Sequence, residues 1–112
     1  MKSRWTGKPI WIHGDLASGN ILVIDGNLSG IIDFGGMAVG DPACDLVIAW
    51  TFFKNHSRRI FKEHVALDAD TWDRARGWAL WKTTFELVAL KDKNSPDAMI
   101  QQKIINDLLT DL

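Results

Sequence analysis

The sequence predicts an α+β domain in which short strands come first and three to four helices follow. Short β-prone runs alternate with glycine-containing loops in the first third of the 112 residues, and apolar residues recur at spacings of three and four in the rest. Because 112 residues fit one domain of ordinary size, we expect residues 1–112 to form a single domain.

A strand, a loop and a β-hairpin are expected first. Residues 9–13 and 21–24 are β-prone runs separated by a polar loop. Asp25-Gly26 is a strong hairpin signal, and residues 28–32 supply the returning strand. Residues 33–42 contain three glycines and are expected to hold no regular structure.

Four helices are expected after this segment. Pro42 suits the first position of one helix, Asp68 or Asp70 can cap the third, and Ser95 can cap the last. The first helix is apolar almost all round, which predicts that it is buried. The predicted ranges are about 42–54, 58–65, 71–92 and 96–109.

The third predicted helix carries an aromatic stripe. A 3-4-3 spacing places its members on one helix face. Such a stripe more often packs in a core than lines a ligand site, and we expect core packing here. The stripe consists of Trp78, Trp81, Phe85 and Val88.

The composition excludes several classes of function. Hydrophobic residues make up 46% and charged residues 24% of the chain, as in a soluble globular protein, and the net charge is -1. Since no run of five like charges occurs, we expect neither a nucleic-acid partner nor a membrane partner. The basic residues around the second helix are expected to form a solvated face. These residues are Lys54, Arg58, Arg59 and Lys62.

The longest strongly apolar stretch, residues 46–53, is far shorter than the roughly 20 residues that span a bilayer. We therefore expect no transmembrane helix. The N-terminus lacks the apolar segment of a signal peptide, which predicts a cytoplasmic protein. The single cysteine, Cys44, cannot form an internal disulfide, and we expect it to be a small buried side chain.

Three oxygen-bearing side chains form the candidate site. Asp15 and Asn20 lie five positions apart on the first loop, and Asp33 ends the returning strand of the hairpin. A hairpin folds Asn20 and Asp33 back to the same end. Phosphoryl transfer from a nucleotide needs hard oxygen ligands for Mg²⁺ and one carboxylate that takes the proton of the accepting hydroxyl. Each residue alone fits a turn or a cap, but the three together at this spacing favour a functional origin.

This arrangement is typical of the catalytic and metal loops of the kinase fold. The sequence resembles the aminoglycoside phosphotransferase and choline kinase family of small-molecule kinases over about residues 9–90. The resemblance rests on His13-Gly14-Asp15-Leu16, Asn20-Ile21-Leu22-Val23, Ile31-Ile32-Asp33-Phe34-Gly35, Gly40-Asp41-Pro42-Ala43-Cys44-Asp45-Leu46 and Arg74-Ala75-Arg76-Gly77-Trp78-Ala79-Leu80.

The resemblance implies the core of a kinase-like C-terminal lobe and an ATP-dependent O-phosphotransferase. It makes Asp15 the catalytic base and makes Asn20 and Asp33 the Mg²⁺ ligands, which also places these two in the cofactor site for ATP or another nucleoside triphosphate. The acceptor is expected to be a small hydroxylated molecule, because Gly14 stands where protein kinases carry an arginine and residues 33–42 are too few for an activation loop.

Supporting roles are implied for three further residues. The resemblance implies that His13 shapes the catalytic loop, and that Asp41 and Asp45 open the next helix and brace that loop. His56 and His64 have no partners at ligand spacing, so we expect both at the surface.

The sequence also predicts what this chain does not contain. Only twelve residues precede His13, and the glycines include no G-x-G-x-x-G arrangement. We therefore expect a kinase-like C-terminal lobe whose nucleotide-binding N-lobe is absent and which is inactive as an isolated chain. The alternative is a non-enzymatic interaction module, or a truncated remnant, with idle kinase motifs.

The large aromatic content predicts self-association. Six tryptophans and five phenylalanines are more than a small open core readily hides, and exposed apolar patches mark interaction surfaces. We expect a homodimer or higher oligomer that buries more than roughly 1,000 Å². The tryptophans expected in the contact are Trp5, Trp11 or one of Trp72, Trp78 and Trp81.

Overall fold

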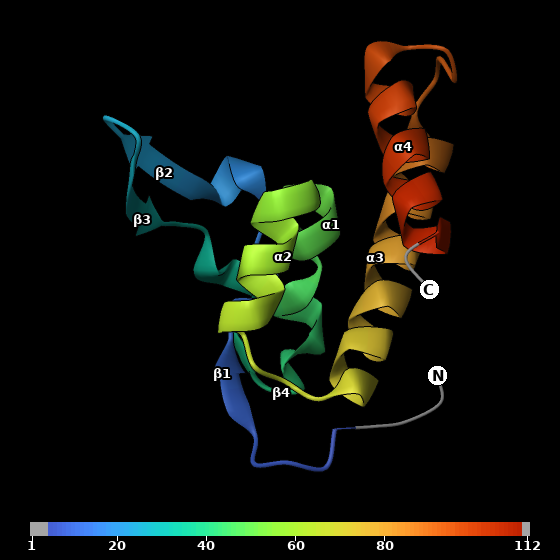
Figure 1. Cartoon of the computed structure of the whole chain (residues 1–112). Helices are drawn as coiled ribbons and strands as arrows, with labels where there is room; N and C mark the ends of the chain where they lie inside the picture. The colour runs from blue at the N-terminus through green and yellow to red at the C-terminus, as the bar shows by residue number, and fades with distance from the viewer. Residues whose placement is uncertain (1–4, 111–112) are drawn as a thin grey trace.

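The computed structural model describes residues 5–110 and has the predicted α+β order, with strands before helices (Figure 1). Three short 3-10 segments, η1 to η3, separate several of these elements. The elements are β1 (Ile10–Ile12), η1 (Ser18–Asn20), β2 (Ile21–Ile24), β3 (Asn27–Ile31), η2 (Phe34–Gly36), β4 (Ala38–Gly40), η3 (Pro42–Leu46), α1 (Ile48–Thr51), α2 (Asn55–His64), α3 (Ala69–Ala89) and α4 (Pro96–Thr110).

The predicted hairpin is confirmed. Strands β2 and β3 pair antiparallel, with Ile21 opposite Ile31 and Ile24 opposite Asn27. The two turn residues have the positive φ values that a tight primed turn requires, 51° at Asp25 and 78° at Gly26. In Figure 1 this hairpin projects from the side of the molecule opposite α3 and α4.

The glycine-rich segment differs from its prediction. Residues 38–40 form β4, which pairs antiparallel with β1 so that Ile10 faces Gly40 and Ile12 faces Ala38. The expectation of irregular backbone throughout residues 33–42 was therefore wrong. Strand formation depends on cross-strand pairing, and β1 supplies a partner that local composition does not reveal.

The first predicted helix is shorter than expected and is divided. Pro42 begins η3 behind Asp41, whose side chain accepts a hydrogen bond from the Ala43 N–H, and α1 follows at Ile48. The second helix begins at Asn55 rather than near residue 58.

The chain reverses between these two helices, and Arg58 stabilises the reversal. Its guanidinium donates to the carbonyl oxygens of Ala49 (2.6 Å) and Phe53 (3.0 Å) and lies 3.6 Å from Asp107 of α4. With only 13% of its side chain exposed, Arg58 is not part of a solvated face, and that expectation was wrong for this residue. Both His56 and His64 are exposed, as predicted.

Helices α3 and α4 form an antiparallel pair at the right of Figure 1. Asp68 caps α3 by accepting from the Thr71 N–H at 2.9 Å, which decides between the two predicted caps. Ser95 Oγ accepts from the Ala98 N–H at 3.1 Å, as predicted for α4. Within residues 5–110, none of the helices is both long and apolar enough to cross a membrane.

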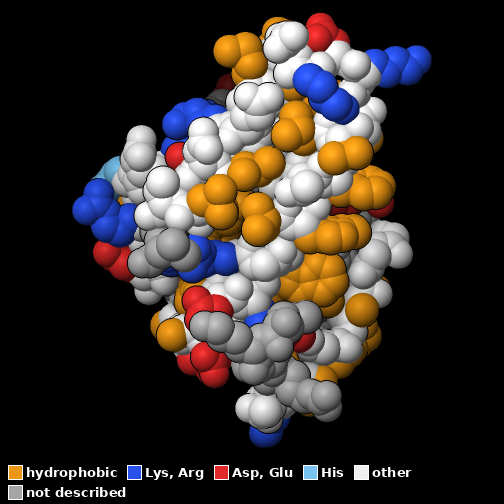
Figure 2. Space-filling view, turned by 90° about the vertical axis from the view of Figure 1, so that its right-hand side faces the viewer, with side chains coloured by type: hydrophobic (Ala, Val, Ile, Leu, Met, Phe, Trp, Pro, Cys, Tyr) orange, Lys and Arg blue, Asp and Glu red, His pale blue; other side chains and the backbone are white. Residues whose placement is uncertain are grey.

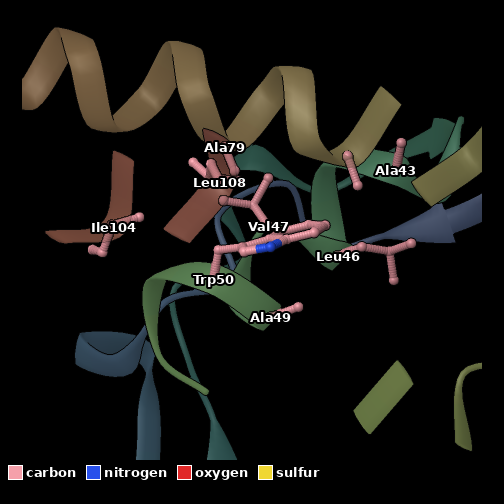
Figure 3. Packing of buried hydrophobic residues seen from close by; sticks show 9 residues of the cluster. Ala43, Leu46, Val47, Ala49, Trp50, Ala79, Ile104 and Leu108 are labelled. Carbon is pink, nitrogen blue, oxygen red and sulfur yellow. The ribbon is translucent and has the colours of Figure 1, made fainter. Parts of the chain in front are cut away.

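The core lies between α1, α3 and α4, and Trp50 is its largest side chain. Trp50 is 1% exposed, which confirms that the first helical segment is buried. Figure 3 shows Trp50 beside Val47, with α3 crossing above the cluster. Because α3 contributes the small side chains of Ala75 and Ala79, the helices approach closely. Leu46, Ile104 and Leu108 complete the packing.

The aromatic stripe of α3 is exposed, so the prediction of core packing was wrong. Trp81, Phe85 and Val88 are 62%, 63% and 70% exposed. The helix instead buries a face of small and polar residues at every fourth position, namely Thr71, Ala75, Ala79 and Thr83. Figure 2, which shows the α3 and α4 side of the molecule, has hydrophobic side chains gathered on its surface.

This exposure bears on the predicted oligomer, which stays a prediction. Trp11 and Trp81 are 72% and 62% exposed, and Trp78 is 42% exposed. We expect sedimentation at micromolar concentration to report a homodimer or larger species, because contact between such side chains removes apolar surface from water. A monodisperse 12.6 kDa monomer would refute this expectation.

The cap of α3 predicts a pH-dependent stability. Hydrogen bonds from the Thr71 hydroxyl and backbone N–H lower the pKa of the Asp68 carboxyl below its ordinary value of 3.8. A carboxyl with a lowered pKa in the folded state stabilises the fold above its unfolded pKa and loses that contribution as the pH falls. We therefore expect Asp68→Asn to destabilise the chain most above about pH 4. The deficit, measured by urea unfolding, should narrow below pH 3.8. A deficit that stays constant down to pH 2.5 would contradict the assignment.

Candidate active site

The loop that carries Asp15 is anchored by one carboxylate from η3. Asp45 accepts hydrogen bonds from the backbone N–H groups of His13 (2.8 Å) and Gly14 (2.9 Å) through its two oxygens. Because η3 packs against the core through Leu46, this pair of bonds fixes the start of the loop relative to the buried part of the molecule.

His13 connects the two halves of the site. Its ring is buried, and its Nδ1 accepts a hydrogen bond from the Asp15 N–H at 3.1 Å. Since Nδ1 is an acceptor there, the proton of a neutral imidazole lies on Nε2, which donates to the Ile32 carbonyl oxygen at 2.8 Å. The imidazole ring of His13 therefore links Asp15 with Ile32, the residue that precedes Asp33.

Asn20 makes a second link between the same segments. Its Nδ2 donates to the Asp15 carbonyl oxygen at 2.9 Å and lies 3.5 Å from the Asp15 carboxylate. Its backbone carbonyl accepts from the Ile32 N–H at 2.9 Å, so Asp33 follows next to Asn20 in the hairpin register. With Nδ2 engaged, the amide oxygen of Asn20 remains available as an acceptor or ligand.

Asp33 has a left-handed backbone and an accessible side chain. Its φ is 62°, in a region that aspartate and asparagine tolerate better than other non-glycine residues. The side chain is exposed and makes no capping hydrogen bond to η2, which begins directly after it.

Two glycines allow the loops of Asp15 and Asp33 to touch. Gly14 has a φ of 91°, and a Cβ atom there would lie 2.2 Å from the Gly36 carbonyl oxygen. Only a residue without a side chain permits this approach.

A cleft of about 580 Å³ opens beside Asp15, and α3 forms one of its walls. Trp78, Trp81 and Lys82 line this wall. The Lys82 Nζ lies 3.9 Å from the Asp15 carboxylate. Sequence reasoning missed this lysine, because only the observed rotation of α3 turns the Trp78 face away from the core and toward the loop.

Asp41 is bonded to α3 and not to the loop that carries Asp15. It caps η3 as expected, and both of its carboxylate oxygens accept from the Arg74 guanidinium, at 2.8 and 3.3 Å. The hydrogen bonds to Asp41 raise the pKa of Arg74, whose side chain is 3% exposed. Asp45 alone makes the hydrogen bonds to the loop that the sequence analysis expected of both aspartates.

Cys44 lies beside these aspartates at the edge of the cleft. It is half-buried, and burial together with the charges of Asp45 and Asp41 raises the pKa of its thiol. The raised pKa keeps the sulfur protonated. The sequence predicted a buried side chain, and the structure shows a partly buried one.

The donor set fits a hard cation with few protein ligands. Across residues 5–110, no three His, Cys, Asp or Glu side chains gather as a metal cluster. The amide oxygen of Asn20 and the carboxylate of Asp33 are oxygen ligands of the kind Mg²⁺ accepts, and Mg²⁺ usually takes one or two protein ligands and completes its shell with water and substrate phosphates.

The chain belongs to the phosphotransferase enzyme family, whose model, APH, matches residues 1–78, well over half of the 112 residues. The matched part contains Asp15, Asn20 and Asp33. Comparisons with curated proteins and with solved structures gave no match.

The contact between the two loops predicts that alanine substitutions at Gly14 and Gly19 have very different effects on the free energy of unfolding. We expect Gly14→Ala to destabilise the chain by at least about 2 kcal/mol in urea unfolding, because the new Cβ meets backbone and φ is positive. Gly19→Ala is the matched control in the same loop, since nothing lies within 4 Å of its added Cβ. Equal effects of the two substitutions would contradict the close approach.

Proposed function

We propose that residues 5–110 form the core of a kinase-like C-terminal lobe and that its site belongs to an ATP-dependent O-phosphotransferase for a small hydroxylated acceptor. The observation that carries the proposal is the bridge through Ile32, whose carbonyl oxygen and N–H bond to His13 and Asn20 respectively. This bridge brings the loop of Asp15 and the turn of Asp33 to one end of the hairpin.

Asp15 is the proposed general base. Its carboxylate is exposed beside the cleft, where an acceptor hydroxyl can reach it. In such a transfer the acceptor oxygen would bond to the γ-phosphorus as the bond to the leaving nucleoside diphosphate breaks, and Asp15 would take the acceptor proton. Asn20 orients this base, since its amide holds the Asp15 carbonyl oxygen.

Asn20 and Asp33 are the residues that would hold Mg²⁺ with its nucleotide, and the ion would neutralise charge on the phosphates. The exposed side chain of Asp33 supports this role, because its carboxylate makes no capping hydrogen bond to η2. The chain's own contribution is the hydrogen bond from the Ile32 N–H to the Asn20 carbonyl oxygen, which places Asp33 one residue beyond the partner of Asn20 at the same end of the hairpin.

A test of the metal site can use Mn²⁺ as the probe. We expect Mn²⁺ to broaden the amide NMR signals of Asn20 and residues 32–35 first. Asp33→Asn should remove most of this effect, because it removes the charge while asparagine still tolerates the left-handed backbone. Asp25→Asn is the matched control, since Asp25 is also left-handed but lies at the far turn of the hairpin. Broadening that is unchanged by Asp33→Asn would refute the site.

The alternative, a non-enzymatic interaction module or truncated remnant with idle motifs, is favoured by the absence of a G-x-G-x-x-G arrangement from the 112 residues. Calorimetry with Mg²⁺ and ATP separates the two. Micromolar affinity would overturn the idle-module alternative, and undetectable binding would support it. We expect weak or no binding by the 112 residues alone, because Mg²⁺ depends on phosphates that no glycine-rich loop of this sequence holds.

A further inference from the structure

The cleft beside Asp15 is lined by charges that are already paired. Of its lining residues, two carry carboxylates, Asp15 and Asp41. Asp15 lies 3.9 Å from Lys82 Nζ, and Asp41 lies 2.8 Å from Arg74 Nε. Because each carboxylate has a cation within ion-pair distance, the wall has no excess negative charge to attract an ammonium group.

The remaining character of the cleft is aromatic. Trp78 and Trp81 line it, with ring centroids 6.2 Å apart in an edge-to-face arrangement. They remain 42% and 62% exposed, although an exposed indole leaves a large apolar surface in water. An indole offers a flat apolar face and one N–H donor, which suits a ligand with a ring of C–H bonds and hydroxyl groups at its rim.

The faces of tryptophan rings also attract cations, so the charge of the side chains beside Trp78 and Trp81 decides between a neutral and a cationic ligand. Lys82 follows Trp78 by four residues and therefore lies on the same face of α3. Its ammonium group and a bound cation would repel each other in the same cleft. The combination of two tryptophans with a lysine thus favours a neutral ligand over a cationic one.

We propose that this cleft selects an uncharged, ring-shaped polyol such as a sugar as the acceptor, with the ring on Trp78 and Trp81 and one hydroxyl at Asp15. Lys82 is the positioning and specificity residue of the site. It holds one oxygen of Asp15 while the Asn20 amide lies 3.5 Å from the other. The inference rests on the proposed function only for the role of Asp15 as the base.

The experiment compares two ligands that differ in one group. Methyl glucoside and methyl 6-amino-6-deoxyglucoside have the same ring, and only the second is cationic at pH 7. Saturation-transfer NMR with the 112-residue chain should show at least about threefold tighter binding of the neutral ligand. Trp81→Ala should weaken that binding about tenfold, as loss of an aromatic contact of this size does. Val88→Ala is its control, because Val88 is exposed on the same helix outside the cleft.

Lys82 variants test the selectivity separately. Lys82→Met should reverse the preference toward the amino sugar, since Asp15 is then uncompensated, whereas Lys82→Arg should keep it. Lys103→Met on α4 serves as the charge control and should leave the preference unchanged. Tighter binding of the amino sugar by the unmodified chain, or sugar binding unaffected by Trp81→Ala, would overturn the proposal. Neither outcome depends on the line broadening by Mn²⁺ that tests Asp33. Failure of the sugar proposal can therefore be distinguished from failure of the proposed function.

Discussion

One carboxylate holds the candidate site to the core. Asp45 binds the first two backbone N–H groups of the loop, and it belongs to η3, whose neighbouring side chain Leu46 is buried. Hydrogen bonds to a charged acceptor are stronger than those between neutral groups, so this contact outweighs an ordinary loop contact. The loop is irregular, yet it starts from a fixed point. The hydrogen bonds of His13 and Asn20 then position Asp15 and Asp33 relative to this anchored segment.

The same short segment also fixes the opposite wall of the cleft. Asp41, at the start of η3, binds the buried Arg74 of α3, and Arg74 in turn donates to the Thr71 hydroxyl. Breaking a buried ion pair leaves an uncompensated charge, so the attachment of α3 resists rotation of the helix. The 3-10 helix η3 and its capping residue Asp41 therefore orient both the loop that carries Asp15 and the aromatic wall of the cleft.

The sequence predicted the features whose cause is local. The hairpin follows from Asp25-Gly26, and the N-termini of α3 and α4 follow from Asp68 and Ser95. Each of these features depends on contacts within a few residues. The sequence-based predictions failed where the structure of a segment depends on a contact with a residue far away in the sequence. Strand β4 exists because β1 pairs with it. The buried face of α3 carries Arg74, paired with Asp41, together with small side chains, and not the aromatic stripe. Lys82 could not be assigned to the site until the buried face of α3 was known.

The pairing of β1 with β4 has a consequence for how the site forms. The ladder joins Ile12 to Ala38, so the whole stretch from His13 to residue 37 is a loop closed by three residue pairs. The hairpin inside it is local and can form early, but the closure of such a loop costs chain entropy that only non-local contacts offset. A ladder this short is also among the first parts of a protein to open. We therefore expect Asp15, Asn20 and Asp33 to gain and lose their relative arrangement together, because all three lie within this closed loop.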